Sequence, residues 1–333
     1  MENTTIDLTG IYNIETKELF LNKYDNLNTK RAFVRIFRNT NIYEEKHEKD
    51  LYLFTKEELQ EFFDHTSPST EISARHYGRL ILQYLKWAVD EEMISEHPFP
   101  VQQHYFLRYV KREKEQFLSF KDLKHYTEYY FKNAQDSIIL ELLFFGVQGK
   151  EGSEICNLTI DDLNEENNSM NLYDDRTGVR RTIYFEDNSL INFCKYAHKQ
   201  DKYEKRNGEM EANPRIRPYT ELIMDTKYIL KNSKTNVTHE TQATRYTLYN
   251  RLKNMQKFEE AVPYKHQLTI KNIVKSGQLY MASKLYQRDG ELELAQLREI
   301  CKHFGVKEHW SLRDYLNLEN LFRLYPHLNK ENK

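Results

Sequence analysis

The chain has 333 residues, enough for two ordinary domains with hydrophobic cores. Hydrophobic residues make up 39% of it and charged residues 30%, a balance that excludes an intrinsically disordered protein. No apolar run approaches membrane-spanning length, and Met1 to Gly10 lacks the basic-then-apolar pattern of a signal peptide. We therefore expect a cytoplasmic protein that makes no membrane contact.

The formal net charge of −2 excludes a uniformly basic surface but leaves room for a basic patch. Between Lys227 and Lys284, eleven Lys and Arg stand against three Glu, so one face can be basic despite the acidic total. Cys156, Cys194 and Cys301 are widely spaced and form no metal-ligand pattern. We expect buried thiols, with no metal and no cofactor.

A polar segment over residues 1–20 comes first, followed by an all-helical region over residues 21–105. Apolar residues recur at helical spacing from Lys30, after the N-cap candidate Thr55, and again after residues 67–70. Exposed basic residues are expected opposite the apolar stripes at Arg35, Arg38, Arg75, Arg79 and Lys86. Such stripes are either solvated helix faces or contacts for DNA phosphates.

Residues 106–117 are polar, basic and aromatic and are predicted to be a linker, which leaves a second domain over residues 118–333. Residues 137–147 are apolar nearly all round and predict a central helix. Two β-like runs at 169–173 and 180–185 flank Thr177-Gly178 and predict a hairpin. An exposed charged loop is expected over residues 199–221. Further helices are expected over residues 241–257, 268–285, 294–304 and 311–324.

The run QGKEGSEICNL at residues 148–158 resembles the arginine-bearing signature of tyrosine recombinases (phage integrases), roughly T-G-L-R-x-S-E-L-x-x-L. Weaker matches follow in the family's order: RTGVRRTI from Arg176, KNIVK from Lys271, FGV from Phe304, and Tyr315. The resemblance implies a mainly α fold with a small β-hairpin or sheet. It also implies a helical core-binding domain that precedes a catalytic-like domain.

In that family a tyrosine attacks a DNA phosphodiester while arginines, a lysine and histidines surround the phosphate. The transition state gathers negative charge, so fixed cations are needed. The resemblance places the arginines at Glu151 and Val274, the histidines at Lys271 and Val306, the lysine at Arg176 and the tyrosine at Tyr315. Since most of these positions have lost the required group, we expect no strand cleavage and regard all six as vestigial.

The sequence thus predicts a DNA-binding protein without recombinase activity, similar to the integrase-like repressors of SPβ-group Bacillus phages. The expected DNA-binding residues are Arg35, Arg38, Arg75, Arg79, Lys86, Arg176, Arg180, Arg181, Arg245, Arg251, Lys271 and Lys275. Arg180 and Arg181 are expected to be exposed hairpin charges. Glu151 is expected either to be solvated or to pair with Arg176, Lys271 or Lys275.

Two other functions stay open at this point. An active recombinase would use Tyr315 as its nucleophile, and an accessory regulator would act through protein contacts. Self-association through residues 316–328 is a further possibility, because active family members donate a C-terminal helix to a neighbour. Double-stranded DNA is the expected partner of a repressor and of an active recombinase, whereas an accessory regulator would have little affinity for it.

Overall fold

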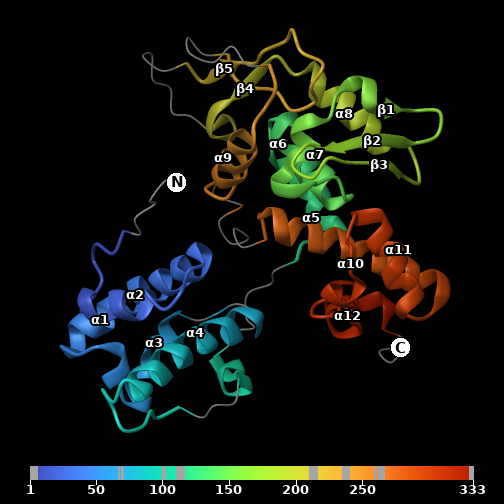
Figure 1. Cartoon of the computed structure of the whole chain (residues 1–333). Helices are drawn as coiled ribbons and strands as arrows, with labels where there is room; N and C mark the ends of the chain where they lie inside the picture. The colour runs from blue at the N-terminus through green and yellow to red at the C-terminus, as the bar shows by residue number, and fades with distance from the viewer. Residues whose placement is uncertain are drawn as a thin grey trace. The chain divides into compact units, whose positions relative to one another are not determined.

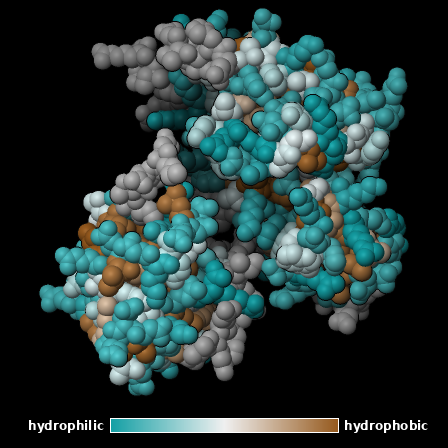
Figure 2. Space-filling model, viewed as in Figure 1, coloured by the Kyte–Doolittle hydropathy of each residue, from teal (hydrophilic) through white to brown (hydrophobic). Residues whose placement is uncertain are grey.

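The computed structural model describes residues 7–66, 68, 71–99, 103–109, 117–209, 217–234, 241–258, 261 and 267–329, in two compact units, Met1–Lys114 and Glu115–Lys333. Figure 1 shows a mainly helical chain with small sheets in the second unit only, which confirms the predicted fold class. On the visible face of each unit the surface is mostly hydrophilic, with scattered hydrophobic residues (Figure 2). No helix in the described ranges has the length and apolar character needed to cross a membrane.

The described residues of the first unit form helices and no strand, and four of these are α-helices. They are α1 (Ile14–Leu21), α2 (Leu27–His47), α3 (Lys56–Thr66) and α4 (Glu71–Asp90). Asn26 caps α2 by accepting from two backbone N–H groups. At the start of α3 the predicted N-cap Thr55 accepts from the Glu58 N–H, and the Glu58 carboxylate accepts from the Thr55 N–H. Aromatic rings fill the core between the helices, with Phe33, Phe37 and Tyr84 all buried.

The described part of the N-terminal segment contributes to this core, whereas residues 1–20 were predicted to form a separate segment; residues 1–6 of that segment lie outside the described residues. Ile11, Phe20 and Leu21 are buried, and Phe20 packs edge-on against Phe33. Helix α1 also buries Lys17, whose ammonium donates to Glu44 and lies 3.6 Å from the Asp50 carboxylate. A lysine at a core position weakens the apolar pattern, which is why the sequence did not reveal this helix.

The predicted linker over residues 106–117 is also too long. Phe106 and Tyr109 are buried in the first core, and the Tyr109 ring stacks on Phe63. Phe117 is buried in the core of the second unit. The rest of the predicted linker, residues 110–116, lies outside the described residues.

The second unit contains the remaining helices and strands. Its helices are α5 (Phe120–Lys124), α6 (Ala134–Phe144), α7 (Ser153–Asn157), α8 (Ser189–Lys199), α9 (Arg245–Met255), α10 (Ile270–Asp289), α11 (Leu294–Phe304) and α12 (Leu318–Leu324). Its strands are β1 (Leu163–Asn164), β2 (Ser169–Asp174), β3 (Val179–Tyr184), β4 (Lys202–Glu204) and β5 (Tyr219–Glu221). The antiparallel hairpin β2–β3 is confirmed, with β1 added at its edge.

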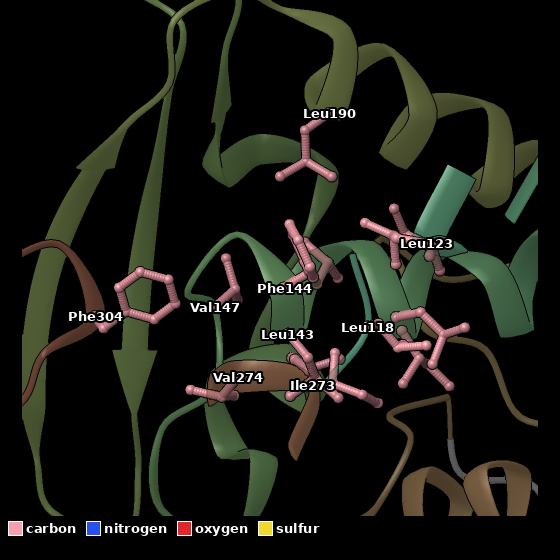
Figure 3. Close-up of a cluster of buried hydrophobic side chains, with 14 of the residues drawn as sticks. Leu118, Leu123, Leu143, Phe144, Val147, Leu190, Ile273, Val274 and Phe304 are labelled. Atoms are coloured by element: carbon pink, nitrogen blue, oxygen red, sulfur yellow. The ribbon is translucent and has the colours of Figure 1, made fainter. Parts of the chain in front are cut away.

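Helix α6 is the centre of this unit, as its all-round apolar sequence predicts. It packs against α10 so closely that a Cβ at Gly277 would lie 1.7 Å from the Phe144 carbonyl oxygen. It carries two buried carboxylates, Asp136 and Glu141, and Glu141 accepts hydrogen bonds from Lys124 and Thr127. Figure 3 shows the resulting core, where Leu143 and Val147 lie beside α10.

The charged stretch over residues 199–221 is partly ordered structure rather than an open loop. Strands β4 and β5 pair with each other, and Asn207 is buried, donating to the Tyr130 carbonyl. The Tyr203 hydroxyl donates to Asp136 at the start of α6. Residues 210–216 lie outside the described residues.

The C-terminal segment packs on its own unit. Leu321 and Leu328 are buried, and Phe322 of α12 meets Tyr286 of α10 edge-on. The Tyr325 hydroxyl accepts from the backbone N–H of Phe120. The apolar residues that would serve an exchanged helix are therefore used within the chain.

Candidate functional site

The positions that the recombinase resemblance singles out in α10 and beyond surround one cavity of about 530 Å³ in the second unit. Lys271, Val274 and Lys275 come from α10, Val306 follows α11, and Tyr315 follows the 3₁₀ turn His309–Leu312. Lys271 and Tyr315, which are 44 positions apart in the sequence, thus line the same cavity. Glu151 and Arg176 are not among the residues that line it.

Helix α10 positions the two lysines that line the cavity. Thr269 caps the helix by accepting from the Asn272 N–H, and Lys271 and Lys275 follow one turn apart. Lys271 is exposed, whereas Lys275 is partly buried with its Nζ 3.9 Å from the centroid of the Tyr315 ring. Burial, and next the charge of Lys271, lower the pKa of Lys275 to about 8, although Asp314 acts in the opposite direction.

Tyr315 is held as a buried phenol. Its side chain is 7% exposed, and its hydroxyl donates a hydrogen bond to the Gln278 amide oxygen. Burial raises the pKa of the phenol, and Cys301 and Asp314 add to the rise. A phenol in this setting is kept neutral, because its environment favours the uncharged form.

Val274 and Val306 give the cavity an apolar wall. Val274 is buried, and Figure 3 shows it beside Leu143, Val147 and Ile273. Val306 is partly buried and packs against the same core. Neither side chain has a hydrogen-bond donor or a charge, so neither can stabilise a phosphate.

Glu151 lies in a 3₁₀ turn (Lys150–Gly152) with a left-handed backbone at φ 60°, and its side chain is 39% exposed. Its carboxylate pairs with Arg245 of α9 at 2.5 Å. The expected partners Arg176, Lys271 and Lys275 do not form this pair. Arg245, which also lies over the Tyr246 ring, therefore has its charge matched by Glu151.

Arg181 is not an exposed hairpin charge, contrary to the prediction. It makes a two-pronged contact with Glu154, both distances being 2.7 Å. It also donates to the carbonyls of Gly146 and His303 at 2.6 Å. Since its side chain is only 17% exposed and its donors are used within the unit, Arg181 connects α7, β3 and the end of α11.

Arg251, which was predicted to contact DNA, is likewise buried and bonded within the chain. Its side chain is 6% exposed. The guanidinium donates to the main-chain and side-chain oxygens of Gln135 and to the Lys231 carbonyl, and it lies 4.9 Å from the Tyr203 ring centroid. It ties α9 to α6 and to the segment that carries β4.

The other hairpin arginines are exposed. Arg176 lies in the β2–β3 turn, where its backbone N–H donates to Asp174, itself held by Ser153. The Arg180 guanidinium lies 4.1 Å from the Tyr173 ring centroid. Both charges face solvent and suit a polyanion.

In the first unit the predicted basic side chains are exposed, namely Arg35, Arg38, Arg75, Arg79 and Lys86. Arg38 pairs with Asp7 at 3.1 Å. Burial, and then the positive charges of Arg79 and Arg35, lower the pKa of His76 on α4. Arg35 of α2 and Arg79 of α4 are therefore close enough to act on one imidazole.

The sequence analysis did not name several residues of the site as functional, Gln278, Gln148 and Tyr249 among them. Gln278 holds the Tyr315 hydroxyl, and Gln148 and Tyr249 line the cavity. Gln278 lies one turn beyond Val274 and Tyr249 one turn beyond Arg245, so helical spacing was the available signal. In the described part of the chain, no group of three or more His, Cys, Asp or Glu has a metal-binding arrangement.

Comparison with known proteins gives matches over both units. Residues 11–90 match the family model described as "MrpR, N-terminal core-binding domain", and residues 117–326 match "MrpR, C-terminal catalytic domain". The SPbeta prophage-derived uncharacterized protein YopR of Bacillus subtilis (strain 168) is 25% identical over 336 residues, covering 95% of this chain and 97% of that protein.

Solved structures of recombinases also align with most of the chain. The Tn1549 transposon integrase in complex with a circular intermediate DNA is 15% identical, with a TM-score of 0.47 over 94% of this chain and 98% of that one. XerA recombinase is 12% identical, with a TM-score of 0.41 over 94% of this chain and 97% of that one.

Proposed function

Because the chain belongs to the MrpR family, whose domains are those of tyrosine recombinases, we propose that it binds double-stranded DNA without cutting it. Its role is that of a sequence-specific transcriptional repressor of a phage or prophage, acting in the bacterial cytoplasm at the nucleoid. The prophage origin of its relative in Bacillus subtilis supports this setting. The observation that carries the proposal is the composition of the cavity around Tyr315.

That cavity keeps cations but lacks the groups that stabilise a phosphorane. Lys271 and Lys275 remain, whereas the valines at 274 and 306 replace an arginine and a histidine. Loss of one preorganised charge-stabilising group typically costs about 3–4 kcal/mol in the transition state, a rate loss of about 10²–10³. Several such losses slow cleavage below any useful rate, although the individual costs do not simply add.

Exposed basic residues supply the means of holding DNA. Arg35, Arg79 and Lys86 in the first unit and Arg176 and Arg180 on the hairpin all face solvent. Each phosphate that such a side chain neutralises releases counterions and adds about −0.9 to the slope of log affinity against log salt. Base contacts from some of them, together with sequence-dependent DNA shape, then provide specificity.

The test is a shift assay with fragments of the source genome, competed with unrelated DNA, at about 50 mM and 200 mM salt. We expect a few fragments to be retained against competitor and a reporter gene downstream of them to be silenced by the protein. Equal retention of all fragments would reject sequence specificity. No shift at the lower salt would favour an accessory protein that works through protein contacts.

An active recombinase is the second candidate, because Tyr315 shares the cavity with Lys271 and Lys275. Its hydroxyl is buried and bonded to Gln278, so a conformational change has to precede any attack on a phosphate. This candidate predicts a covalent protein–DNA adduct that disappears in Tyr315→Phe.

A further inference from the structure

Lys275 lies in an unusual setting for a lysine side chain. It lines the cavity around Tyr315 and is partly buried, with its Nζ over the phenol ring. Within the described ranges, no carboxylate lies within 4.0 Å of that Nζ to form an ion pair. The amine is therefore partly desolvated and has no ion pair. The Tyr315 ring favours its charged form, whereas partial burial and the lack of an ion pair favour the neutral form that makes a lysine nucleophilic.

The charged and titratable groups that act on it are Lys271 on the same helix and Asp314 next to Tyr315. Burial and Lys271 outweigh Asp314, giving a pKa of about 8. At pH 8 about half of such an amine is neutral, against less than about 1% of an ordinary lysine with a pKa near 10.4. The reactive neutral form is thus enriched at Lys275 relative to an ordinary lysine.

We propose that Lys275 is an acylation site for small acyl phosphates, with the Lys271 ammonium holding the phosphate end of the reagent. Lys271 is exposed and one helical turn from Lys275, so the two side chains reach the same cavity. The cavity volume of about 530 Å³ accommodates a small acyl phosphate. Gln148, Thr269 and Ser311 provide further hydrogen-bonding groups along its wall.

The reaction needs no other co-reactant. The Nζ lone pair attacks the acyl carbon, an N–C bond forms, and the C–O bond to phosphate breaks. Phosphate leaves with the bonding electron pair, the amine loses a proton to solvent, and the products are an amide and inorganic phosphate. The amide removes one of the two positive charges of the cavity. The chemistry at Lys275 does not depend on whether the protein binds DNA.

The full-length protein is treated with acetyl phosphate at pH 8, and acetylation at each lysine is followed by peptide mass spectrometry. Lys284 is the matched control on the same helix, since its ion pair with Glu186 and its contact with Tyr280 raise its pKa. We expect initial acetylation at Lys275 to be at least about tenfold faster than at Lys284. Equal rates at the two lysines would overturn the proposal.

A second comparison isolates the role of Lys271. An uncharged acylating reagent, N-hydroxysuccinimidyl acetate, reports the nucleophilicity of Lys275 without any phosphate to hold. In Lys271→Met the ratio of the acetyl phosphate rate to the uncharged-reagent rate at Lys275 falls, and in Lys271→Arg it is restored. An unchanged ratio in Lys271→Met would show that Lys271 does not hold the phosphate.

Discussion

Replacement of Arg181 by methionine tests the assignment of this arginine to structure instead of DNA binding. The change leaves the Glu154 carboxylate, only 3% exposed, without its cation, and it removes the donors to the carbonyls of Gly146 and His303. Breaking a buried pair by removing one partner costs about 3–5 kcal/mol. Total unfolding free energies are about 5–15 kcal/mol, so the loss is large.

For a unit of this size each kcal/mol lowers the melting temperature by about 2–4 °C, so we expect Arg181→Met to lower it by about 6–20 °C in scanning calorimetry. Arg180→Met on the same strand is the matched control. Its guanidinium is exposed over Tyr173, an interaction of about 0.5–1 kcal/mol, and its melting temperature should fall by no more than about 4 °C.

Below the melting temperature, Arg180→Met should impair DNA binding more than Arg181→Met does. Arg180→Met removes a solvent-facing charge, so the salt slope of DNA affinity should become shallower by about 1. Arg181→Met should leave that slope unchanged, because the buried guanidinium contacts no phosphate. Equal melting temperatures for the two variants would refute the structural role of Arg181.

Three further predictions follow from ion pairs and a histidine. Glu151→Gln releases Arg245 from its ion pair, so DNA affinity should rise and its salt slope should steepen by about 1, with no gain for the remote exposed-pair control Glu165→Gln. Lys17→Met leaves the buried carboxylates of Glu44 and Asp50 without their cation and should lower the unfolding free energy of the first unit by about 3–5 kcal/mol in urea titrations. The control Lys46→Met removes an exposed ion pair and should lower that free energy by at most about 1 kcal/mol. The pKa of His76 is lowered in the free protein, and a nearby DNA phosphate would raise it. DNA affinity should therefore increase as pH falls through the region of 6.5. A flat pH profile of affinity, identical to that of His76→Gln, would contradict the placement of His76 beside a DNA phosphate.

Much of the fold follows from periodicity and turn chemistry. Helix α6 was predictable because its own residues are apolar on nearly every side. The β2–β3 hairpin was predictable because Thr177-Gly178 lies between two runs of β-like residues. Helix α1 was not, because a buried lysine interrupts its apolar pattern. The strand pair β4–β5 was not either, because its anchors are polar residues such as Asn207 whose partners lie far away in the sequence.

The same distinction holds for the site. Motif order alone indicated that Lys271, Val306 and Tyr315 belong together, and one cavity contains them. The roles of individual charges could not be predicted, because an arginine in a sequence does not reveal its long-range partner. Arg181 finds two carbonyls and Glu154, and Glu151 finds Arg245 at a separation of 94 residues.

The central claim is DNA binding without cleavage, and a covalent-adduct assay on nicked suicide substrates made from the retained genome fragments tests it most directly. We predict that the protein shifts these substrates specifically and leaves no denaturation-resistant protein–DNA species. Wild type and Tyr315→Phe should then be indistinguishable. An adduct formed by the wild-type protein and lost in Tyr315→Phe would contradict the account and identify the chain as an active recombinase.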